Sequence, residues 1–319
     1  MRQFVVLLLL LVPGIARTQS PVTKGKALYE EKRYEAAVKV LEEIQEDNPD
    51  YAAAQYYLGR IAFDQNQLDD AVDFFEEATE AKGGNQAEYF SFLGDSYGRI
   101  AQDASVIRQG ILAPKMKAAW EKAISLDPKI LSARYSLISY YTQAPAFMGG
   151  SMDKAKEMAR QIIALAPAPG HRQLGNLYLK EKNLVAAEKE YQEMAKIDPA
   201  FLPVLGNFYV NEKMTEKAFG LFDEQLKKNP DDMLAIYQLG KLSAVSGQRL
   251  DQGEQYLLRY LSYTPKNNEP SHAGANMRLA QIYEKKGKRA DAKLKYEAAL
   301  KLDSKLQEAK DGLSRVSKM

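Results

Sequence analysis

Apolar residues recur three and four positions apart through nearly all of the chain beyond its first twenty residues. Residues 34–44 show the pattern, with four apolar residues on one side and four charged residues on the other: Ala37, Val38, Leu41 and Ile44 against Glu35, Lys39, Glu42 and Glu43. This spacing matches the period of an amphipathic helix. No stretch of useful length alternates as a strand does, so the pattern predicts an all-α protein.

The predicted helices follow one sequence pattern that repeats eight times along the chain, with a period near 34 residues. Its clearest copy, residues 174–199, carries Gly175, Ala187, Tyr191 and a closing Pro199. The Gly position is held in turn by Gly25, Gly59, Gly94, Ile138, Gly175, Gly206, Gly240 and Ala280, with gaps of 34, 35, 44, 37, 31, 34 and 40 residues. The large position of the second half is held by Leu41, Phe75, Trp120, Ala159, Tyr191, Phe222, Leu257 and Tyr296. Small residues let two helices approach closely, and Pro, which has no amide hydrogen, ends the second helix.

These positions, in phase over about residues 24–304, resemble the tetratricopeptide repeat family. The resemblance implies an all-α, right-handed α-α superhelix, a solenoid of about eight helix pairs in which each repeat touches only its neighbours. We expect one solenoid over 19–319, with repeats near 18–51, 52–86, 87–130, 131–167, 168–198, 199–232, 233–272 and 273–304, and a polar capping helix over 305–319. The fourth repeat departs most, because Ile138 stands for Gly and Ala159 for the aromatic residue.

Residues 1–18 are patterned as a secretory signal peptide. Arg2 gives a positive start, and an unbroken apolar run over 4–12 is too short for a comfortable membrane span. The alternative is an uncleaved anchor. The chain has no Cys, which excludes disulfides and a lipid-linked Cys and favours bacterial export, so we expect a periplasmic or secreted protein. Cleavage after Thr18 leaves 42 basic and 42 acidic residues, a balance that indicates neither a nucleic-acid partner nor stable membrane insertion of the mature protein.

The sequence contains no arrangement of residues that is typical of an enzyme, a metal site or a cofactor site. Its two His, His171 and His272, are far apart, fall in predicted turns between repeats and have no second ligand at metal-binding spacing. No nucleophile elbow, phosphate loop or dinucleotide fingerprint is present. We therefore expect a non-catalytic protein without a cofactor or metal ion, whose function depends on its surface.

In the tetratricopeptide family the first helix of each repeat lines a concave groove, and the residue after the Gly position points into it. Here that column holds Lys26, Arg60, Asp95, Ser139, Asn176, Asn207, Lys241 and Gln281, and residues four positions earlier include Tyr56, Tyr135, Arg172 and Tyr237. The resemblance therefore makes seven of them candidate partner-binding residues: Arg172, Asn176, Asn207, Lys241, Tyr56, Tyr135 and Tyr237. Amides and Arg bind a peptide backbone or carboxylate, and Tyr packs against apolar side chains.

Arg172, Asn176 and Asn207 partly resemble the carboxylate clamp of chaperone-binding members of the family. Leu234 and Gln238 stand where such a clamp needs further basic residues, so we do not predict chaperone binding. The alternative is that Arg172 and Asn176 only solvate the groove or bond to neighbouring helix ends.

Two insertions, near 100–115 and 143–150, interrupt the third and fourth repeats between their paired helices. Both should emerge on one edge of the solenoid, and insertions gathered on one side often mark a binding face. The second insertion presents Phe147 and Met148 as candidate partner-binding residues, and it looks like a stretch found in some exported bacterial repeat proteins. The alternative is that Phe147 tucks under the first insertion as a local core.

The sequence thus predicts a protein- or peptide-binding scaffold of the bacterial envelope, with a partner of unknown identity. Two alternatives stay open: a glycan or small-molecule binding module that uses the Tyr-containing groove, and a structural protein that assembles with itself as a homo-oligomer.

Overall fold

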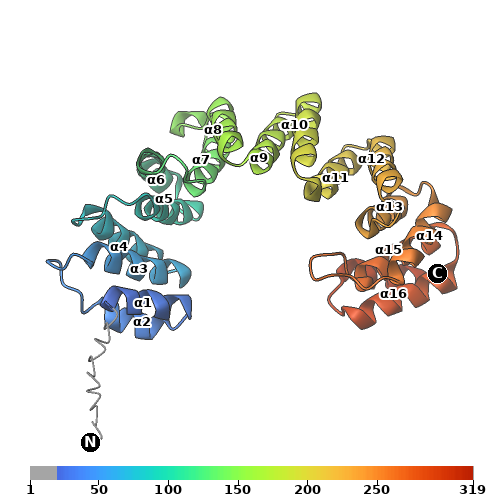
Figure 1. The fold of residues 1–319 in the computed structure, drawn as a ribbon, viewed down its shortest axis with the longest axis horizontal. Helices are drawn as coiled ribbons and strands as arrows, with labels where there is room; N and C mark the ends of the chain where they lie inside the picture. Colours follow the sequence, from blue (N-terminus) through green and yellow to red (C-terminus); the bar gives the residue numbers. More distant parts are fainter. Residues whose placement is uncertain (1–19, 319) are drawn as a thin grey trace, which may run out of the picture. The chain divides into compact units, whose positions relative to one another are not determined.

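The computed structural model describes residues 20–318, and within this range every regular element is a helix. The described chain divides into two compact units, one ending at Leu165 and one beginning at Ala166. The first unit contains α1 (Pro21–Glu30), α2 (Tyr34–Leu41), α3 (Tyr51–Asp64), α4 (Leu68–Glu80), α5 (Ala87–Gln102), α6 (Val106–Leu126), α7 (Ser132–Gln143), the 3-10 turn η1 (Ala146–Met148) and α8 (Met152–Leu165) (Figure 1).

The second unit contains α9 (Pro167–Lys180), α10 (Leu184–Ile197), the 3-10 turn η2 (Pro199–Phe201), α11 (Leu202–Asn211), α12 (Thr215–Lys228), α13 (Met233–Ser246), α14 (Leu250–Leu261), α15 (His272–Lys285), α16 (Arg289–Leu302) and α17 (Gln307–Lys318). The predicted signal peptide, residues 1–18, lies outside the described residues. None of the helices described between residues 20 and 318 combines the length and the apolar character needed to cross a membrane.

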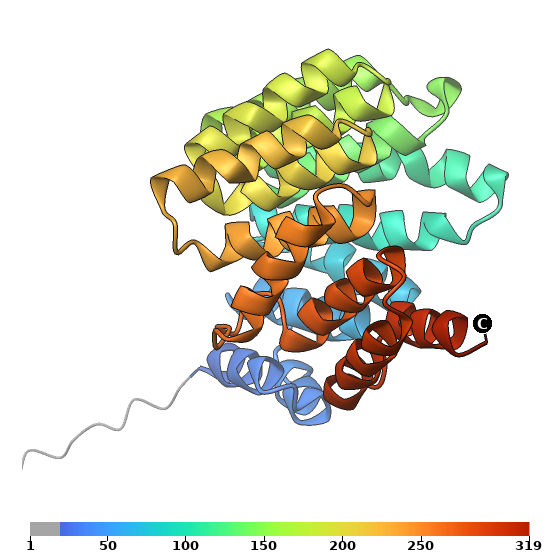
Figure 2. The same cartoon turned by 90° about the vertical axis from the view of Figure 1, so that its right-hand side faces the viewer.

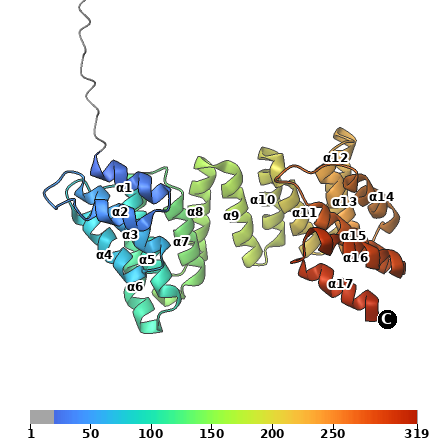
Figure 3. The ribbon, with the colours of Figure 1, turned by 90° about the horizontal axis from the view of Figure 1, so that it is seen from below.

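The helices pack as consecutive antiparallel pairs, and within each unit every pair also packs on the next pair. Figure 3 shows α7 and α8 side by side, and Figure 1 shows the same arrangement for α15 and α16. Eight pairs, α1/α2 to α15/α16, follow one another in the described chain, and α17 follows the last pair. The predicted all-α solenoid fold with a C-terminal capping helix is confirmed.

The Gly position of the repeat is a point of close approach between the two helices of a pair. A Cβ atom placed on Gly59 would lie 2.7 Å from the ring of Phe75, and one on Gly206 would lie 2.6 Å from the ring of Phe222. Such distances are too short for real atoms, so only Gly fits against the large residue at these positions. The repeat pattern therefore indicates which small residue faces which large one. In the fourth repeat the sizes are exchanged, and both Ile138 and Ala159 are buried.

The capping helix α17 packs on α15 and α16 and shares an apolar core with them. Figure 2 shows this last helix in dark red, beside the other red helices at the C-terminal end of the chain. Its Ala309 and Val316 are buried, and its Gly312 lies directly against the ring of Tyr296. The Arg315 guanidinium makes two hydrogen bonds to the Glu284 carboxylate, at 2.9 and 3.1 Å. Buried apolar contacts hold this helix, and the partly exposed ion pair adds little to them.

The first insertion is mostly helical, which the sequence did not predict. α5 continues to Gln102 and α6 begins at Val106, so residues 100–115 extend these two helices rather than form a separate loop. The Ser105 hydroxyl accepts a hydrogen bond from the Arg108 amide at 3.4 Å and so caps the first turn of α6. The second insertion contains the short turn η1, which ends at Gly149 in the left-handed conformation, with a φ of 97°.

Candidate functional site

The two insertions meet in the first unit, as their positions in the repeats predicted. A Cβ atom placed on Gly110 of α6 would lie 3.9 Å from the Met148 Cε atom, an ordinary van der Waals contact. The Tyr140 hydroxyl of α7 donates a hydrogen bond to the Met148 carbonyl oxygen. This bond ties the second insertion back onto the helix that precedes it. We call residues 100–115 and 143–150 together the insertion edge.

The insertion edge exposes large apolar side chains to solvent. Val106, Ile107, Ile111 and Phe147 are 66%, 80%, 60% and 81% exposed. These four are among only eleven large apolar side chains that are exposed in the described part of the chain, although the insertion edge is a short part of it. The alternative in which Phe147 tucks into a local core is wrong, because its ring lies in solvent. Met148, in contrast, is half-buried and faces inward.

Beneath the insertion edge lies a cavity of about 560 Å³, which we call the insertion cavity. The first insertion contributes one part of its wall and the second insertion another: Ala101, Gln102, Gln109 and Ala113 from the first, and Gln143, Ala144, Pro145 and Met148 from the second. Its inner end is formed by side chains of α5, α6 and α7, among them Asp95, Trp120 and Tyr140. A volume of this size falls in the range of small-ligand pockets.

Among residues 20–318, Asp95 of α5 is the one acidic residue that lines the insertion cavity. Its Oδ1 atom accepts hydrogen bonds from Trp120 Nε1 at 2.8 Å and from Ser136 Oγ at 2.7 Å. Burial raises the pKa of this carboxyl group above its usual range, and the two hydrogen bonds oppose the shift. No Lys, Arg or His of residues 20–318 lies within ion-pair distance of it.

Arg99, one helical turn beyond Asp95, is the only basic residue of the described chain in the cavity wall. Its guanidinium donates to the Phe63 carbonyl oxygen at 3.2 Å and to Asn66 Oδ1 at 2.5 Å, and it lies 4.6 Å from the centroid of the Phe63 ring. These contacts hold the guanidinium against the end of α3. Arg99 therefore does not neutralise Asp95.

The predicted groove column lies at the surface in both units. Lys26, Ser139, Asn176 and Asn207 are exposed, and Arg60, Asp95, Lys241 and Gln281 are half-buried. The residues one turn earlier differ from the prediction. Tyr135 is half-buried, but Tyr56 is only 4% exposed, with its ring stacked 4.5 Å from that of Tyr89. The expectation of an exposed Tyr56 ring is wrong, because the ring packs between two repeats.

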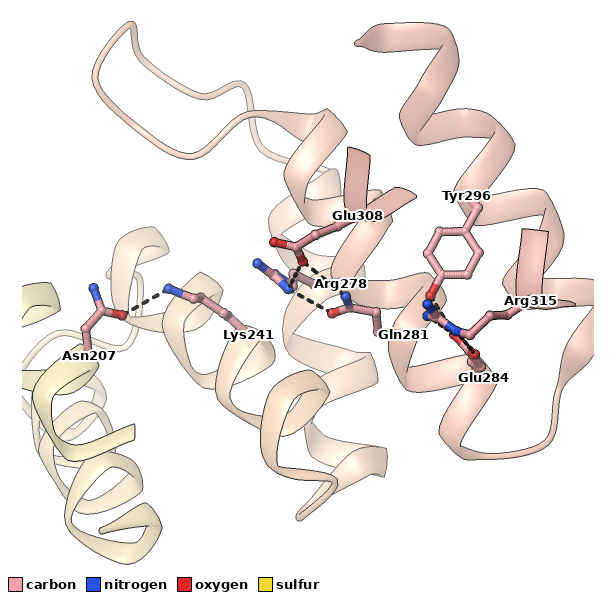
Figure 4. Close-up of polar contacts among 8 residues, drawn as sticks. All are labelled: Asn207, Lys241, Arg278, Gln281, Glu284, Tyr296, Glu308 and Arg315. Atoms are coloured by element: carbon pink, nitrogen blue, oxygen red, sulfur yellow. Dashed lines mark hydrogen bonds and ion pairs between the residues drawn. The ribbon is translucent and has the colours of Figure 1, made fainter. Parts of the chain in front are cut away.

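In the second unit, three of the predicted side chains make contacts within the protein (Figure 4 shows two of them). Lys241 Nζ donates to Asn207 Oδ1 at 3.0 Å, from α13 to α11. Asn176 accepts a hydrogen bond from the Tyr191 hydroxyl at 2.7 Å. Arg172 is exposed, and its charge opposes the rise that burial causes in the pKa of Tyr191. Asn176 thus bonds to the second helix of its own repeat.

Tyr237 is only 8% exposed, so its ring is also not available as a groove surface, contrary to the prediction. Gln238, at the place where a carboxylate clamp needs a basic residue, is likewise buried. Burial, with the nearby charge of Arg278, lowers the pKa of Lys241. Arg278 itself is paired with Glu308 of the capping helix at 2.8 Å and with Gln281 at 3.0 Å (Figure 4). The basic groups here are largely engaged by the protein itself.

The two His residues differ from their predicted place in exposed turns. His171 lies inside α9, half-buried, with Nδ1 2.7 Å from a carboxylate oxygen of Glu190. His272 begins α15, and its Nε2 lies 2.7 Å from the Tyr263 carbonyl oxygen. Within residues 20–318, no three His, Cys, Asp or Glu side chains gather closely enough to hold a metal ion.

The sequence did not single out Asp95, Trp120 or Ser136 as a group. Asp95 appears there only as one member of the groove column, and Trp120 only as the large residue of its repeat. The available signal was that the sole Trp of the chain fills the large position of the same repeat that places an acidic residue after its Gly. Ser136 comes from the following repeat, so its part in the group depends on how the two repeats pack.

Comparison with known proteins agrees with this geometry. Family models of the tetratricopeptide repeat match residues 22–86 and 273–306. The Hsp70-Hsp90 organising protein of Plasmodium falciparum (isolate 3D7) is 26% identical over 172 residues, which cover 53% of this chain and only 28% of that protein.

Two solved structures are among those that match this chain. The crystal structure of the C-terminal part of a TPR repeat-containing protein from Cytophaga hutchinsonii is 15% identical, with 92% of this chain and 99% of that chain covered and a TM-score of 0.51. A TPR protein of Thermus thermophilus is 20% identical over 60% of this chain and 98% of that chain, with a TM-score of 0.44. At these identities only the Cytophaga likeness bears on the fold, and it agrees with the matched repeats. The repeat matches, the Gly-to-large-residue contacts and the eight helix pairs together identify this chain as a tetratricopeptide repeat protein.

Proposed function

We propose that this protein is a non-catalytic scaffold that binds another protein through its insertion edge. The proposal includes export to the periplasm or beyond, in a bacterial envelope, which rests on the signal-peptide pattern of residues 1–18 and on the lack of Cys. The name of the Plasmodium relative says that it organises Hsp70 and Hsp90, which supports a protein-binding role in general. The buried Gln238 gives no support to a chaperone as the partner here.

The observation that carries the proposal is the exposure of four large apolar side chains on the insertion edge. Monomeric proteins rarely leave such side chains gathered in solvent, and gathered ones mark interaction sites. Ile107 and Phe147, at 80% and 81% exposed, are the most exposed of the four. They come from two separate insertions. A partner that contacts both side chains would therefore fix the two insertions relative to each other.

The polar strip of the second unit is the weaker candidate for the same role. Asn207 already accepts from Lys241, and Asn176 already accepts from Tyr191, so a partner would have to compete with bonds inside the protein. The glycan alternative loses support, because Tyr56 and Tyr237 are buried and cannot stack on a sugar.

The test is capture of a partner from envelope extract by the immobilised mature protein and by two variants. Ile107→Asp combined with Phe147→Asp should weaken binding at least about tenfold, as expected where an apolar hot spot receives a charge. Val185→Asp is the matched control, because Val185 is 82% exposed in the second unit and lies far from the insertions in sequence.

Several outcomes would decide between the alternatives. Equal capture by the Ile107/Phe147 variant and the wild type, with unchanged melting temperatures, would refute the insertion edge as the docking surface. Loss of capture with Asn176→Ala and Asn207→Ala instead would assign the partner to the polar strip. Capture of no protein, together with binding on a glycan array, would favour the glycan alternative. A sedimentation mass of one chain at high concentration would remove self-assembly.

A further inference from the structure

The insertion cavity presents a carboxylate without a cation. Both hydrogen bonds to Asp95 end on its Oδ1 atom, from Trp120 Nε1 and Ser136 Oγ. Its Oδ2 atom has no hydrogen bond or ion pair with any residue of the described chain. Partial burial makes the charged form of this carboxyl group costly, and a positive group that reaches Oδ2 through the cavity would offset this cost. The Asp95 side chain is also fixed in place, because its two donors come from α6 and α7.

The remaining wall of the cavity suits an apolar stem that ends in such a group. Met116, Ala113, Pro145 and Met148 supply apolar surface, and Phe63 supplies an aromatic one. Gln143 Nε2 is engaged by Ser139 Oγ at 2.6 Å, which leaves its amide oxygen to accept from a donor. The lining therefore offers acceptors together with apolar contacts.

We propose that the insertion cavity binds an alkylammonium or alkylguanidinium group, with the charged end at Asp95 and the apolar stem between the two insertions. This site lies beneath the exposed side chains of the insertion edge and is lined by other residues of the same two insertions, and it does not depend on the proposed function. It assigns a role to the two extended repeats, whose added residues form much of the cavity wall.

Other occupants fit the cavity less well. A metal ion needs several anionic or imidazole ligands, and no such group exists among residues 20–318. An anion would be repelled by Asp95, and Arg99 is already held by Phe63 and Asn66. A sugar needs an open aromatic face, but Trp120 and Tyr140 are only 4% and 7% exposed, and the Arg99 guanidinium lies over the Phe63 ring, 4.6 Å from its centroid.

The charged group has two sources: a free amine, or a Lys or Arg side chain of a polypeptide. The cavity volume of about 560 Å³ exceeds what one alkylammonium fills, so both sources fit. The two are distinguished by comparing n-pentylamine with a capped tripeptide that carries a central Lys. Tighter binding of the tripeptide assigns the site to a polypeptide, and tighter or equal binding of the amine assigns it to a small molecule.

Trp120 provides a direct readout, because it is the only Trp in the chain and its indole N–H bonds to Asp95. The experiment titrates the mature protein with n-pentylamine and, separately, with 1-pentanol, while following the indole N–H resonance by NMR. The amine should move the resonance in a saturable manner, and the neutral alcohol should bind at least about tenfold more weakly. This comparison uses the wild-type protein alone and so needs no variant.

Asp95→Asn is the decisive variant, since an amide oxygen can still accept from Trp120 and Ser136 while the charge is lost. It should weaken binding of n-pentylamine about ten- to hundredfold, the usual range for a hydrogen bond to a charged group. Asp153→Asn, a 94% exposed side chain in the same unit, is the control for the change in net charge and should bind as the wild type does.

Two results would overturn the proposal. One is an equal response of the indole resonance to amine and alcohol, or equal amine binding by Asp95→Asn and wild type, which would make the cavity a site for neutral apolar groups. The other is an unchanged indole resonance at amine and tripeptide concentrations of about 100 mM, weaker than any functional site.

Discussion

Two glycines of α5, Gly94 and Gly98, face the same Trp120 ring with different clearances. A Cβ atom on Gly94 would lie 2.5 Å from Trp120 Nε1, whereas one on Gly98 would lie 3.5 Å from the nearest ring atom. The first distance is a clash and the second an ordinary contact. Gly94 belongs to the repeat pattern, and Gly98 does not.

Alanine at these two positions should therefore have opposite effects. Gly94→Ala should lower the free energy of unfolding by about 1–3 kcal/mol, because the Trp120 ring must move. Gly98→Ala should raise it by about 0.5–1 kcal/mol, because Ala is the better helix former. Urea unfolding of both variants measures the difference. A destabilised Gly98→Ala protein would show that the ring packs differently from the structure.

The repeat pattern predicted contacts of this kind well, because a Gly and a large residue at fixed spacing face each other in every regular pair. It could not predict which side chains bond to Asp95, or that no cation of the described chain pairs with it. These relations depend on Trp120 and Ser136, which come from two other helices, and on the absence of a neighbouring cation in the described chain. The exposure of Tyr56 and Tyr237 was predicted wrongly for a similar reason, since neighbouring repeats cover these rings.

The pH dependence of stability should carry a contribution from Asp95. Burial raises its pKa in the folded protein above the ordinary value of about 3.9, and the hydrogen bonds from Ser136 and Trp120 only oppose this. At a pH between the pKa of Asp95 in the unfolded protein and its raised pKa in the folded protein, the folded state holds a proton that the unfolded state releases. The contribution is therefore fully present below about pH 3.9 and is lost as the pH rises through the raised value.

Asp95→Asn should remove this contribution while keeping the two hydrogen bonds. The free energy of unfolding of the variant, relative to the wild type, should rise as the pH increases from about 3.9 through the raised pKa of Asp95, and then stay level. Urea unfolding at a series of pH values measures it. A difference between the two proteins that is constant or falls over this range would contradict the assignment of a raised pKa.

At the level of secondary-structure elements, the second insertion is held by a small number of bonds to α7. The Tyr140 hydroxyl donates to the Met148 carbonyl oxygen, and the Ser151 amide donates to the Tyr141 carbonyl oxygen at 2.9 Å. Gly149 supplies the left-handed turn between these two anchors. The segment thus has a defined conformation although much of it is exposed.

Tyr140→Phe should loosen this segment. The loss of one hydrogen bond costs about 1 kcal/mol, and hydrogen exchange and protease cleavage should increase over residues 144–150. Tyr141→Phe is the control, because the neighbouring Tyr141 is buried to a similar degree but its hydroxyl makes no hydrogen bond in the described chain. Equal protection of the segment in the two variants would show that the Tyr140 bond does not hold it.

Each helix pair could be predicted from the spacing of the apolar residues and from the repeated positions of Gly and Pro. The extent of α6 could not be predicted, because residues 106–113 interrupt the repeat spacing in the way that a loop between two helices would. The Ser105 cap and the continuous helix across Pro114 show that the insertion lengthens a repeat helix. The placement of both insertions on one edge followed correctly from their equivalent positions in the repeats.

At the scale of the whole molecule, the repeat pattern predicted the fold class. It did not predict that the chain divides into two compact units. The repeat phase continues across residues 165 and 166, where the chain passes from one compact unit to the other. Nothing in the pattern marks that boundary. The candidate sites belong to different units: the insertion edge and insertion cavity to the first, and the polar strip to the second.

The central claim is that the insertion edge docks a protein partner. It is tested most directly by placing a photo-crosslinking amino acid in turn at positions 107, 147 and 185 and irradiating the native cells. Positions 107 and 147 should give adducts to the same protein, lost on competition by wild-type protein but not by the Ile107→Asp, Phe147→Asp double variant. Position 185, equally exposed, should give none. The same adduct at all three positions, or no adduct at 107 and 147, would contradict the claim.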